Sequence, residues 1–211
     1  MEKGKLIIVS GFSGVGKGTV IKNLMNRHPE KYAFSISATT RKPRPGEENG
    51  REYYFVSRAE FISMIEDKEL LEHAEYSGNF YGTPASPIEK LLNEGKNIIL
   101  DIEVKGMKQV KAMRPETITV FIIPPSAEEL IKRLNNRGTE TEEQIMSRLT
   151  KATEEGVFAS EYDCIICNED VEQTTDTLEM CISEGSQSPS EKEKNINLSR
   201  EICECINKRI K

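Results

Sequence analysis

Strand-like apolar runs alternate with amphipathic segments along most of the chain. The runs predict buried strands at residues 6–9, 32–37, 97–102, 117–123 and 164–167. Between them, apolar residues recur every three or four positions, which predicts helices at 17–28, 84–94, 104–113, 126–136 and 141–152. Continuous apolar strands joined through helices are typical of a parallel sheet that is covered on both faces. The pattern therefore predicts an α/β fold.

The stretch 37–83 interrupts this alternation. Strand-like residues occupy 51–57 and 70–76, and 78–82 has the composition of a turn. Ser57 and Glu60 have the spacing of a capping box, which predicts a short helix ahead of Phe61. Two further helix starts are predicted in the same way, by Ser126 with Glu129 and by Thr141 with Gln144. We expect 37–83 to be a small β-rich subdomain inserted into the α/β core.

The C-terminal end departs from the core in composition. Residues 185–195 are rich in Gly, Ser, Glu and Lys, which is typical of a linker. Beyond them Leu198, Ile202, Ile206 and Ile210 recur at every fourth position and give one apolar stripe on a final helix. We expect this stripe to dock on the domain rather than on another protein.

A glycine-rich loop follows the first strand. Gly11, Gly14, Gly16 and Gly18 surround Lys17, and the helix pattern starts directly afterwards. Glycines let backbone N–H groups converge on phosphate oxygens, and a helix N-terminus and a lysine add positive charge. The spacing is that of a P-loop. An ordinary glycine-rich turn is the alternative, but it leaves unexplained a lysine where the helix dipole disfavours one.

Composition limits the partners. The net charge is −6 and 30% of the residues are charged. An acidic chain argues against broad binding to nucleic acid or membranes. No apolar run approaches the roughly 18–20 residues of a membrane span, and no signal peptide is evident, so we expect a cytoplasmic protein.

Five cysteines occur, all after residue 163, and we expect reduced thiols. Cys164 and Cys167 could suggest a zinc site together with Cys203 and Cys205. However, residues three apart on a strand face opposite sides of it, so the first two are not expected to share one metal ion.

Five stretches in a fixed order resemble the guanylate kinase family, whose members phosphorylate GMP with ATP. They are GFSGVGKGT, SISATTRKPRPGEENGREYYFV, LLEHAEYSGNFYGTP, ILDIEVKG and KRLNNRGTETEEQIMSRL. The resemblance implies a nucleoside monophosphate kinase-like domain at 1–185. It divides this domain into a core (1–36, 84–136 and 153–185), a GMP-binding subdomain (37–83) and a helical lid (137–152). The tail 186–211 lies beyond the resemblance.

Chemistry supports a phosphate site in the GMP-binding subdomain. Arg41 and Arg44 flank Pro43, and two guanidinium groups held apart suit a phosphate dianion. The resemblance implies that both bind the GMP phosphate, that Tyr53 and Tyr81 donate hydroxyls to it, and that Glu47 orients the arginines. A solvated basic loop and simple packing of the tyrosines are the alternatives.

Guanine presents N1–H and a 2-amino group on one edge, and a carboxylate accepts both. The resemblance implies that Glu72 does this, with Ser37 and Thr83 near O6. Asp101 and Glu103 lie at the C-terminal end of a buried strand, where parallel sheets bind ligands. The resemblance implies that they complete the GMP site.

The ATP site implied by the resemblance includes the glycine loop and three residues far along the chain. Its members are Gly11, Phe12, Ser13, Gly14, Val15, Gly16, Lys17, Gly18, Thr19, Arg133, Arg137 and Asn168. Lys17, Arg44, Arg137 and Arg148 are the implied catalytic residues, and Asn168 is the implied adenine contact. Magnesium is implied as the cofactor. Residue 18 is Gly and has no hydroxyl, so the hydroxyl ligand of magnesium would be that of Thr19, or water would take its place.

The main alternative is a non-catalytic guanylate kinase-like interaction module, but such modules typically have a degraded phosphate loop. Another nucleoside monophosphate kinase is disfavoured by the Arg41 and Arg44 loop and by Glu72. The expected partners are ATP and GMP, with dGMP as a further acceptor and with no nucleic acid or membrane. The expected assembly is a monomer or a homodimer.

Overall fold

The structure is a computed structural model that describes residues 3–136 and 141–210. The chain divides into two compact units, and strand β1 leads from the first into the second. One unit comprises Met1–Leu6 and Glu30–Thr117. The other comprises Ile7–Pro29 and Ile118–Lys211.

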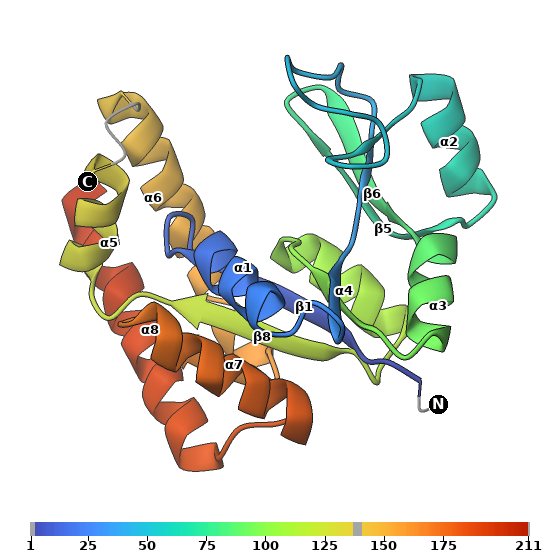
Figure 1. Cartoon of the computed structure of the whole chain (residues 1–211). Coiled ribbons are helices and arrows are strands. Elements are labelled where there is room, and N and C mark those ends of the chain that lie inside the picture. The colour runs from blue at the N-terminus through green and yellow to red at the C-terminus, as the bar shows by residue number, and fades with distance from the viewer. Residues whose placement is uncertain (1–2, 137–140, 211) are drawn as a thin grey trace. The chain divides into compact units, whose positions relative to one another are not determined.

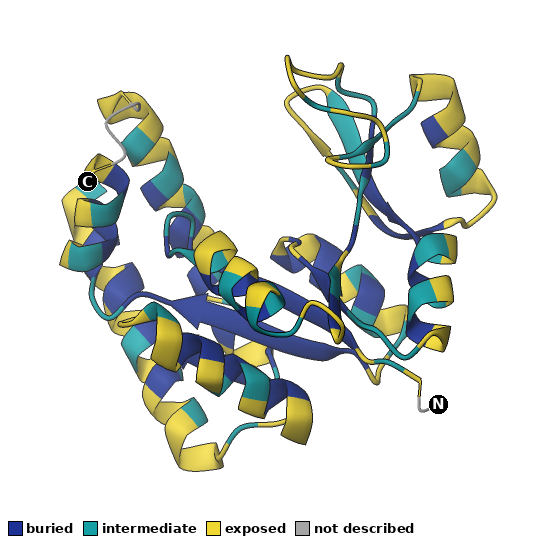
Figure 2. Cartoon of the chain, viewed as in Figure 1, coloured by how far each residue is buried: buried dark blue, intermediate teal, exposed yellow. Residues whose placement is uncertain are grey.

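The second unit is built on three parallel strands. They are β1 (Leu6–Gly11), β8 (Ile118–Ile123) and β9 (Cys164–Cys167), with β8 in the middle. Val9 pairs with Val120, and Phe121 pairs with Ile165. All residues of β1 and β8 are buried (Figure 2), which explains why their apolar runs are unbroken.

Helices surround these strands (Figure 1). They are α1 (Lys17–Arg27), α5 (Ala127–Asn135), α6 (Glu142–Gly156), α7 (Val171–Glu184) and α8 (Pro189–Ile210), with the short 3₁₀ helix η1 (Ala159–Glu161). The cap predicted at Ser126 and the capping box predicted at Thr141 are confirmed. Helix α6 continues past the predicted end of the lid at 152.

The first unit holds a pair of parallel strands and a small second sheet. In the pair, β2 (Tyr32–Phe34) lies beside β7 (Asn97–Leu100), and Ile98 N donates to Lys5 O of the segment that leads into β1. The small sheet has the order β4-β3-β6-β5. Its strands are β3 (Ala38–Thr39), β4 (Tyr54–Phe55), β5 (Leu70–Tyr76) and β6 (Asn79–Pro84). Parallel strands flanked by helices, with an inserted β subdomain, confirm the predicted fold class.

Three helices complete this unit: α2 (Arg58–Glu66), α3 (Ala85–Asn93) and α4 (Val104–Met113). The capping box of Ser57 and Glu60 at the start of α2 is confirmed. The small sheet and α2 share a core of their own, in which the rings of Phe61 and Phe80 stack at 5.3 Å.

Two predictions in the subdomain were wrong. The strand expected at 51–57 is only Tyr54–Phe55, because the Asn49 side chain accepts from Phe55 N and holds the preceding residues in a turn. The turn expected at 78–82 occupies only Ser77 and Gly78, whose φ angles are 49° and 75°. Two successive positive φ angles make a tight hairpin turn, so the chain returns at once as β6.

The C-terminal region also differs from expectation. Helix α7 was not predicted, although Asp170 caps it and its buried face includes Leu178 and Ile182. The linker expected at 185–195 was wrong from Pro189 onward, because α8 begins there. Docking of α8 on the domain is confirmed, since Ile202 and Ile206 are buried against the second unit.

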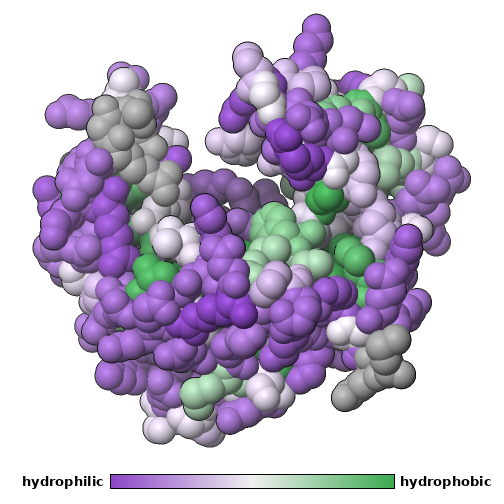
Figure 3. Space-filling view, in the orientation of Figure 1, coloured by the Kyte–Doolittle hydropathy of each residue, from purple (hydrophilic) through white to green (hydrophobic). Residues whose placement is uncertain are grey.

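The surface on the face shown in Figure 3 is mostly hydrophilic, in agreement with the high content of charged residues. None of the helices in the described part of the chain has the length and the apolar character needed to cross a membrane.

Candidate functional site

The glycine loop joins β1 to α1 in the second unit. Phe12 N donates to Ile122 O of β8 at 3.1 Å, and Val15 N donates back to Phe12 O at 3.0 Å, so the loop is tied to the sheet and to itself. Gly16 is the N-cap of α1, and no side chain caps the helix. The first N–H groups of α1 therefore remain suited to an anion, with Lys17 beside them.

Glycine is required in this loop for steric reasons. Gly14 and Gly16 have φ angles of 90° and 93°, in the left-handed region. A Cβ on Gly14 would lie 2.5 Å from the Leu134 side chain, and one on Gly16 would lie 2.9 Å from Asn168 Nδ2. Gly18 differs, because a Cβ there would meet nothing within 4 Å.

A buried polar network supports the loop from beneath. Val15 O accepts from Arg133 Nη1 at 3.1 Å and from Asn168 Nδ2 at 2.8 Å. Arg133 also donates to Asn168 O at 3.0 Å and to Glu129 at 3.0 Å. Thr174 on α7 donates to Asn168 Oδ1 at 3.0 Å.

This network includes two residues that are predicted for the ATP site, Asn168 and Arg133. Asn168 is only 3% exposed, and its amide and its side-chain oxygen both bind within the protein. Its side chain fixes the Val15 carbonyl, and its contact with adenine stays a prediction. Arg133 likewise holds backbone carbonyls below the loop. Sequence patterns carry no signal for the two bonds to Val15 O, because these join residues more than 100 positions apart.

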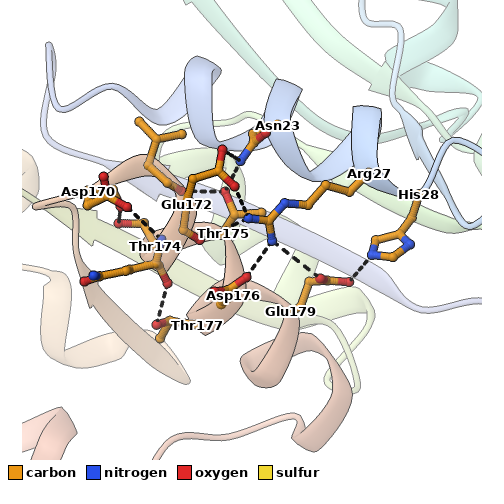
Figure 4. A network of polar contacts seen from close by, with 12 residues as sticks. Asn23, Arg27, His28, Asp170, Glu172, Thr174, Thr175, Asp176, Thr177 and Glu179 are labelled. Atoms are coloured by element: carbon orange, nitrogen blue, oxygen red, sulfur yellow. Dashed lines mark hydrogen bonds and ion pairs between the residues drawn. The ribbon is translucent and has the colours of Figure 1, made fainter.

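Helix α1 is also clamped to α7 (Figure 4). Arg27 pairs with Glu172 and, at 2.6 Å, with Asp176. Hydrogen bonds to these carboxylates raise the pKa of Arg27 above its ordinary value. Asn23 on α1 also bonds Glu172 and Thr175, and His28, directly after α1, lies 3.1 Å from Glu179. The clamp fixes the direction in which α1 presents its N-terminus.

The remaining residues predicted for this half of the site lie on the same unit. Lys17 is half-buried at the start of α1, Thr19 is exposed in its first turn, and Arg148 is half-buried on α6. Arg137 lies outside the described residues.

The residues predicted to bind the GMP phosphate lie together in the first unit. Glu47 accepts from Arg41 Nη2 at 2.9 Å and from Arg44 N at 2.7 Å, so one carboxylate holds both arginine positions. The hydrogen bond with Arg41 lowers the pKa of Glu47 and raises the pKa of Arg41. The Arg41 guanidinium lies 5.3 Å from the centre of the Tyr53 ring, which lies 6.1 Å from the Tyr81 ring.

Glu72 lies at an irregularity of β5. The register against β6 shifts between Leu70 and His73, which is a bulge. Glu72 is 7% exposed, and its carboxylate accepts from Thr83 Oγ1 at 2.6 Å. Its Oε2 lies 2.9 Å from where a Cβ on Gly106 would be, so glycine in the first turn of α4 leaves it room.

Burial raises the pKa of Glu72 above its ordinary value. The Thr83 hydrogen bond opposes this shift, and the charge of Glu103 adds to it. The Thr83 hydroxyl donates to Glu72, which differs from the predicted contact with O6. Ser37 is half-buried, whereas Asp101 and Glu103 are exposed just after the C-terminal end of β7, as their position in the sequence predicts.

Gln109 on α4 was not identified from the sequence. Its side chain accepts from His73 N at 3.1 Å and donates to His73 O at 3.0 Å. It thus pairs with the backbone next to Glu72, where the bulge disrupts the ladder to β6. A polar residue in an amphipathic helix carries no local signal for such a contact.

Stability should depend on the ionisation of Glu72. Unfolded Glu72 loses its proton near pH 4.5 and folded Glu72 at a higher pH, so between these values the folded state binds more protons and is destabilised as the pH rises. We expect Glu72→Gln to remove this effect. The Tm of the variant relative to the parent should increase between pH 4 and 7, measured by calorimetry.

The matched control is Glu75→Gln, at an exposed acid on the same strand. A Tm difference for Glu72→Gln that is flat or decreasing over this range would contradict a raised pKa.

Comparisons with known proteins agree with this geometry. The family model described as guanylate kinase matches residues 3–185. A guanylate kinase from Trichormus variabilis is 49% identical over 181 residues, covering 86% of this chain and 90% of its own. One from Desulfitobacterium hafniense is 47% identical over 175 residues, covering 83% and 87%. The crystal structure of guanylate kinase from Anaplasma phagocytophilum is 32% identical, covers 89% of each chain and has a TM-score of 0.67. The chain belongs to the guanylate kinase family.

Proposed function

We propose that the chain transfers the γ-phosphoryl group of ATP to GMP, giving ADP and GDP, and that it accepts dGMP in the same way. The observation that carries the choice of base is the buried Glu72 carboxylate, whose Oε1 is held by Thr83. A carboxylate in this state accepts the two donors of guanine and rejects adenine, which lacks them.

On the ATP side, the glycine loop and the N-terminus of α1 bind the phosphates. Lys17 neutralises charge on the β- and γ-phosphate oxygens, and Arg137 and Arg148 do so from the lid side. Arg133 and Asn168 contribute indirectly, because they hold the Val15 carbonyl and so the shape of the loop.

Magnesium is the proposed cofactor, and the residues present fit it. Mg²⁺ bound with a nucleotide keeps several waters and takes few protein ligands. The Thr19 hydroxyl, exposed in the first turn of α1, provides one oxygen, while Gly18 provides none. When bound, the ion neutralises phosphate charge.

On the GMP side, Arg41 and Arg44 bind the phosphate dianion, with the hydroxyls of Tyr53 and Tyr81. We also assign Arg44 to the neutralisation of charge on the transferred group. Glu72 reads the guanine edge, while Ser37, Asp101 and Glu103 complete the pocket. No general base is required, because the attacking phosphate oxygen is already ionised.

The test is an ADP-release assay of the purified protein with ATP and each of AMP, CMP, GMP, UMP and dGMP. We expect turnover with GMP and dGMP and rates at least 10³-fold lower with the others. The absence of GMP-dependent ADP formation would favour the non-catalytic module, which the curated relatives do not favour. We further propose a cytoplasmic role in GMP recycling, which is supported by five free thiols, as in a reducing compartment.

Glu47 should affect GMP but not ATP. Glu47→Ala removes the carboxylate that binds Arg41 Nη2 and Arg44 N, so the Arg41 guanidinium and the backbone that carries Arg44 lose a shared anchor. We expect the KM for GMP to rise roughly tenfold, as charge-assisted hydrogen bonds of this kind commonly produce, with the KM for ATP within twofold.

Steady-state kinetics with each substrate varied in turn measures this effect. Glu48→Ala, at an exposed acid that bonds Arg51, is the matched control and should behave like the parent. Equal changes in both KM values for Glu47→Ala would indicate a general structural role instead.

A further inference from the structure

Helix α8 lies beyond the part of the chain that the family model matches, which ends at residue 185. It belongs nevertheless to the second compact unit, where it packs on α6, β9 and α5. Figure 1 shows it in red beside α5. Its contacts suggest a role in the phosphoryl-transfer site.

The approach to α8 and its first turns are fixed to β9. Ile165 N donates to Gln187 Oε1 at 2.9 Å, and Ile165 O accepts from Asn195 Nδ2 at 2.7 Å. Two side-chain amides thus satisfy both backbone groups of one residue in β9. Because buried backbone groups left unpaired are costly, these bonds fix where α8 lies on the sheet.

The middle of α8 lies against the C-terminal end of α6. Ser199 Oγ donates to Gly156 O at 3.1 Å, and the Cys203 thiol lies 3.9 Å from Thr153 O. Ser199 and Cys203 are buried. A Cβ on Gly156 would lie 2.5 Å from Cys203 Sγ, so only glycine allows this approach.

Gly156 also touches the phosphate loop. The same added Cβ would lie 2.5 Å from Phe12 Cζ. Phe12 is the first loop residue after β1, its N–H is bound to Ile122 O, and its ring meets Phe121 edge-on at 5.8 Å. Gly156 is thus enclosed between α8 on one side and the phosphate loop on the other.

We propose that α8 positions α6 for phosphoryl transfer. Through Ser199 and Cys203 it holds the C-terminal end of α6 against Phe12. Arg148 lies eight residues earlier on the same helix, about 12 Å along its axis. A helix transmits a tilt at one end to the other, so this contact sets the position of Arg148 relative to the phosphate loop. The inference rests on the proposed function, in which Arg148 acts on the ATP phosphates.

The test uses the full-length protein and substitutions at the contact. Gly156→Ala introduces a Cβ for which there is no room. It should lower kcat/KM for ATP roughly tenfold, since a misplaced catalytic group can cost up to 10² in rate. The KM for GMP should stay within twofold of the parent value. Gly156→Ala combined with Cys203→Ala makes room on the α8 side only, because the Phe12 ring still lies 2.5 Å from the added Cβ, and should recover the part of the loss that is due to α8. Cys205→Ala, at an exposed thiol on the same helix, is the matched control and should equal the parent.

Ser199→Ala is the milder variant if Gly156→Ala does not fold. It removes one hydrogen bond to Gly156 O and should raise the KM for ATP a few-fold, with the KM for GMP unchanged. Folded variants with parental ATP kinetics would overturn the proposal. Parallel losses for ATP and GMP, or no recovery in the double variant, would overturn it as well.

A binding measurement separates this inference from the proposed function. The affinity for a non-hydrolysable ATP analogue, measured by calorimetry, should fall in Gly156→Ala and recover in the double variant, even if GMP is not the acceptor. If the parent protein does not phosphorylate GMP, the proposed function is refuted. If the variants bind the ATP analogue as tightly as the parent does, the role of α8 is refuted.

Discussion

Lys17→Ala is expected to lower kcat for GMP phosphorylation by on the order of 10³ or more, because removal of a charge from the transferring phosphoryl group removes transition-state stabilisation. Lys17 is the first residue of α1, where Gly16 is the cap and no side chain competes for the first N–H groups. The loop that carries it is held by Phe12 N and by the two donors to Val15 O. The loss should therefore be chemical rather than structural.

Steady-state kinetics, with circular dichroism to confirm the fold, measures this effect. Lys22→Ala, at an exposed lysine on the same helix, is the matched control and should keep parental turnover. A folded Lys17→Ala variant with near-normal kcat would refute the proposed mechanism.

Glu72→Gln is expected to lower kcat/KM for GMP by on the order of 10²–10³, which corresponds to ~3–4 kcal/mol of transition-state stabilisation. Glutamine keeps the size of the side chain but replaces one acceptor by a donor. If Oε1 continues to accept from the Thr83 hydroxyl, the new NH₂ group opposes a donor of guanine. The KM for ATP should change little, because Glu72 belongs to the GMP subdomain.

Two further variants define this effect. Ser37→Ala should lose less, because a neutral hydrogen bond contributes about 1 kcal/mol. Glu75→Gln, exposed on the same strand, should match the parent. If Glu72→Gln retains its preference for GMP over AMP within a few-fold of the parent, then the carboxylate does not read the base.

Local signals predicted the parts of the fold that are formed from neighbouring residues. The phosphate loop combines a buried strand, positive-φ glycines and a helix start within 14 residues, all visible in the sequence. The caps at Ser57, Ser126 and Thr141 depend on residues three positions apart, and the structure has each of them. Such features could be predicted because their partners are close in sequence.

The parts that were missed depend on distant partners or on backbone conformation. The hairpin turn at Ser77 and Gly78 requires two positive φ angles, one of them at a serine, which composition does not indicate. The hydrogen bond from the Thr83 hydroxyl to Glu72 on the neighbouring strand was not predicted. The hydrogen bond from Asn168 to a carbonyl 153 positions away was not predicted either. A polar residue type indicates that the side chain forms a hydrogen bond, but it does not identify the group at the other end of that bond.

The two side-chain amides that bind the backbone of Ile165 limit association between copies of this chain. Strand β9 is the last strand of its sheet, and an outer strand with open backbone groups is a template for cross-strand aggregation. Here Gln187 and Asn195 occupy the N–H and C=O of Ile165, in the middle of a four-residue strand. A second molecule cannot extend the sheet there without first displacing these amides, so the C-terminal segment also protects the chain against self-association through this edge.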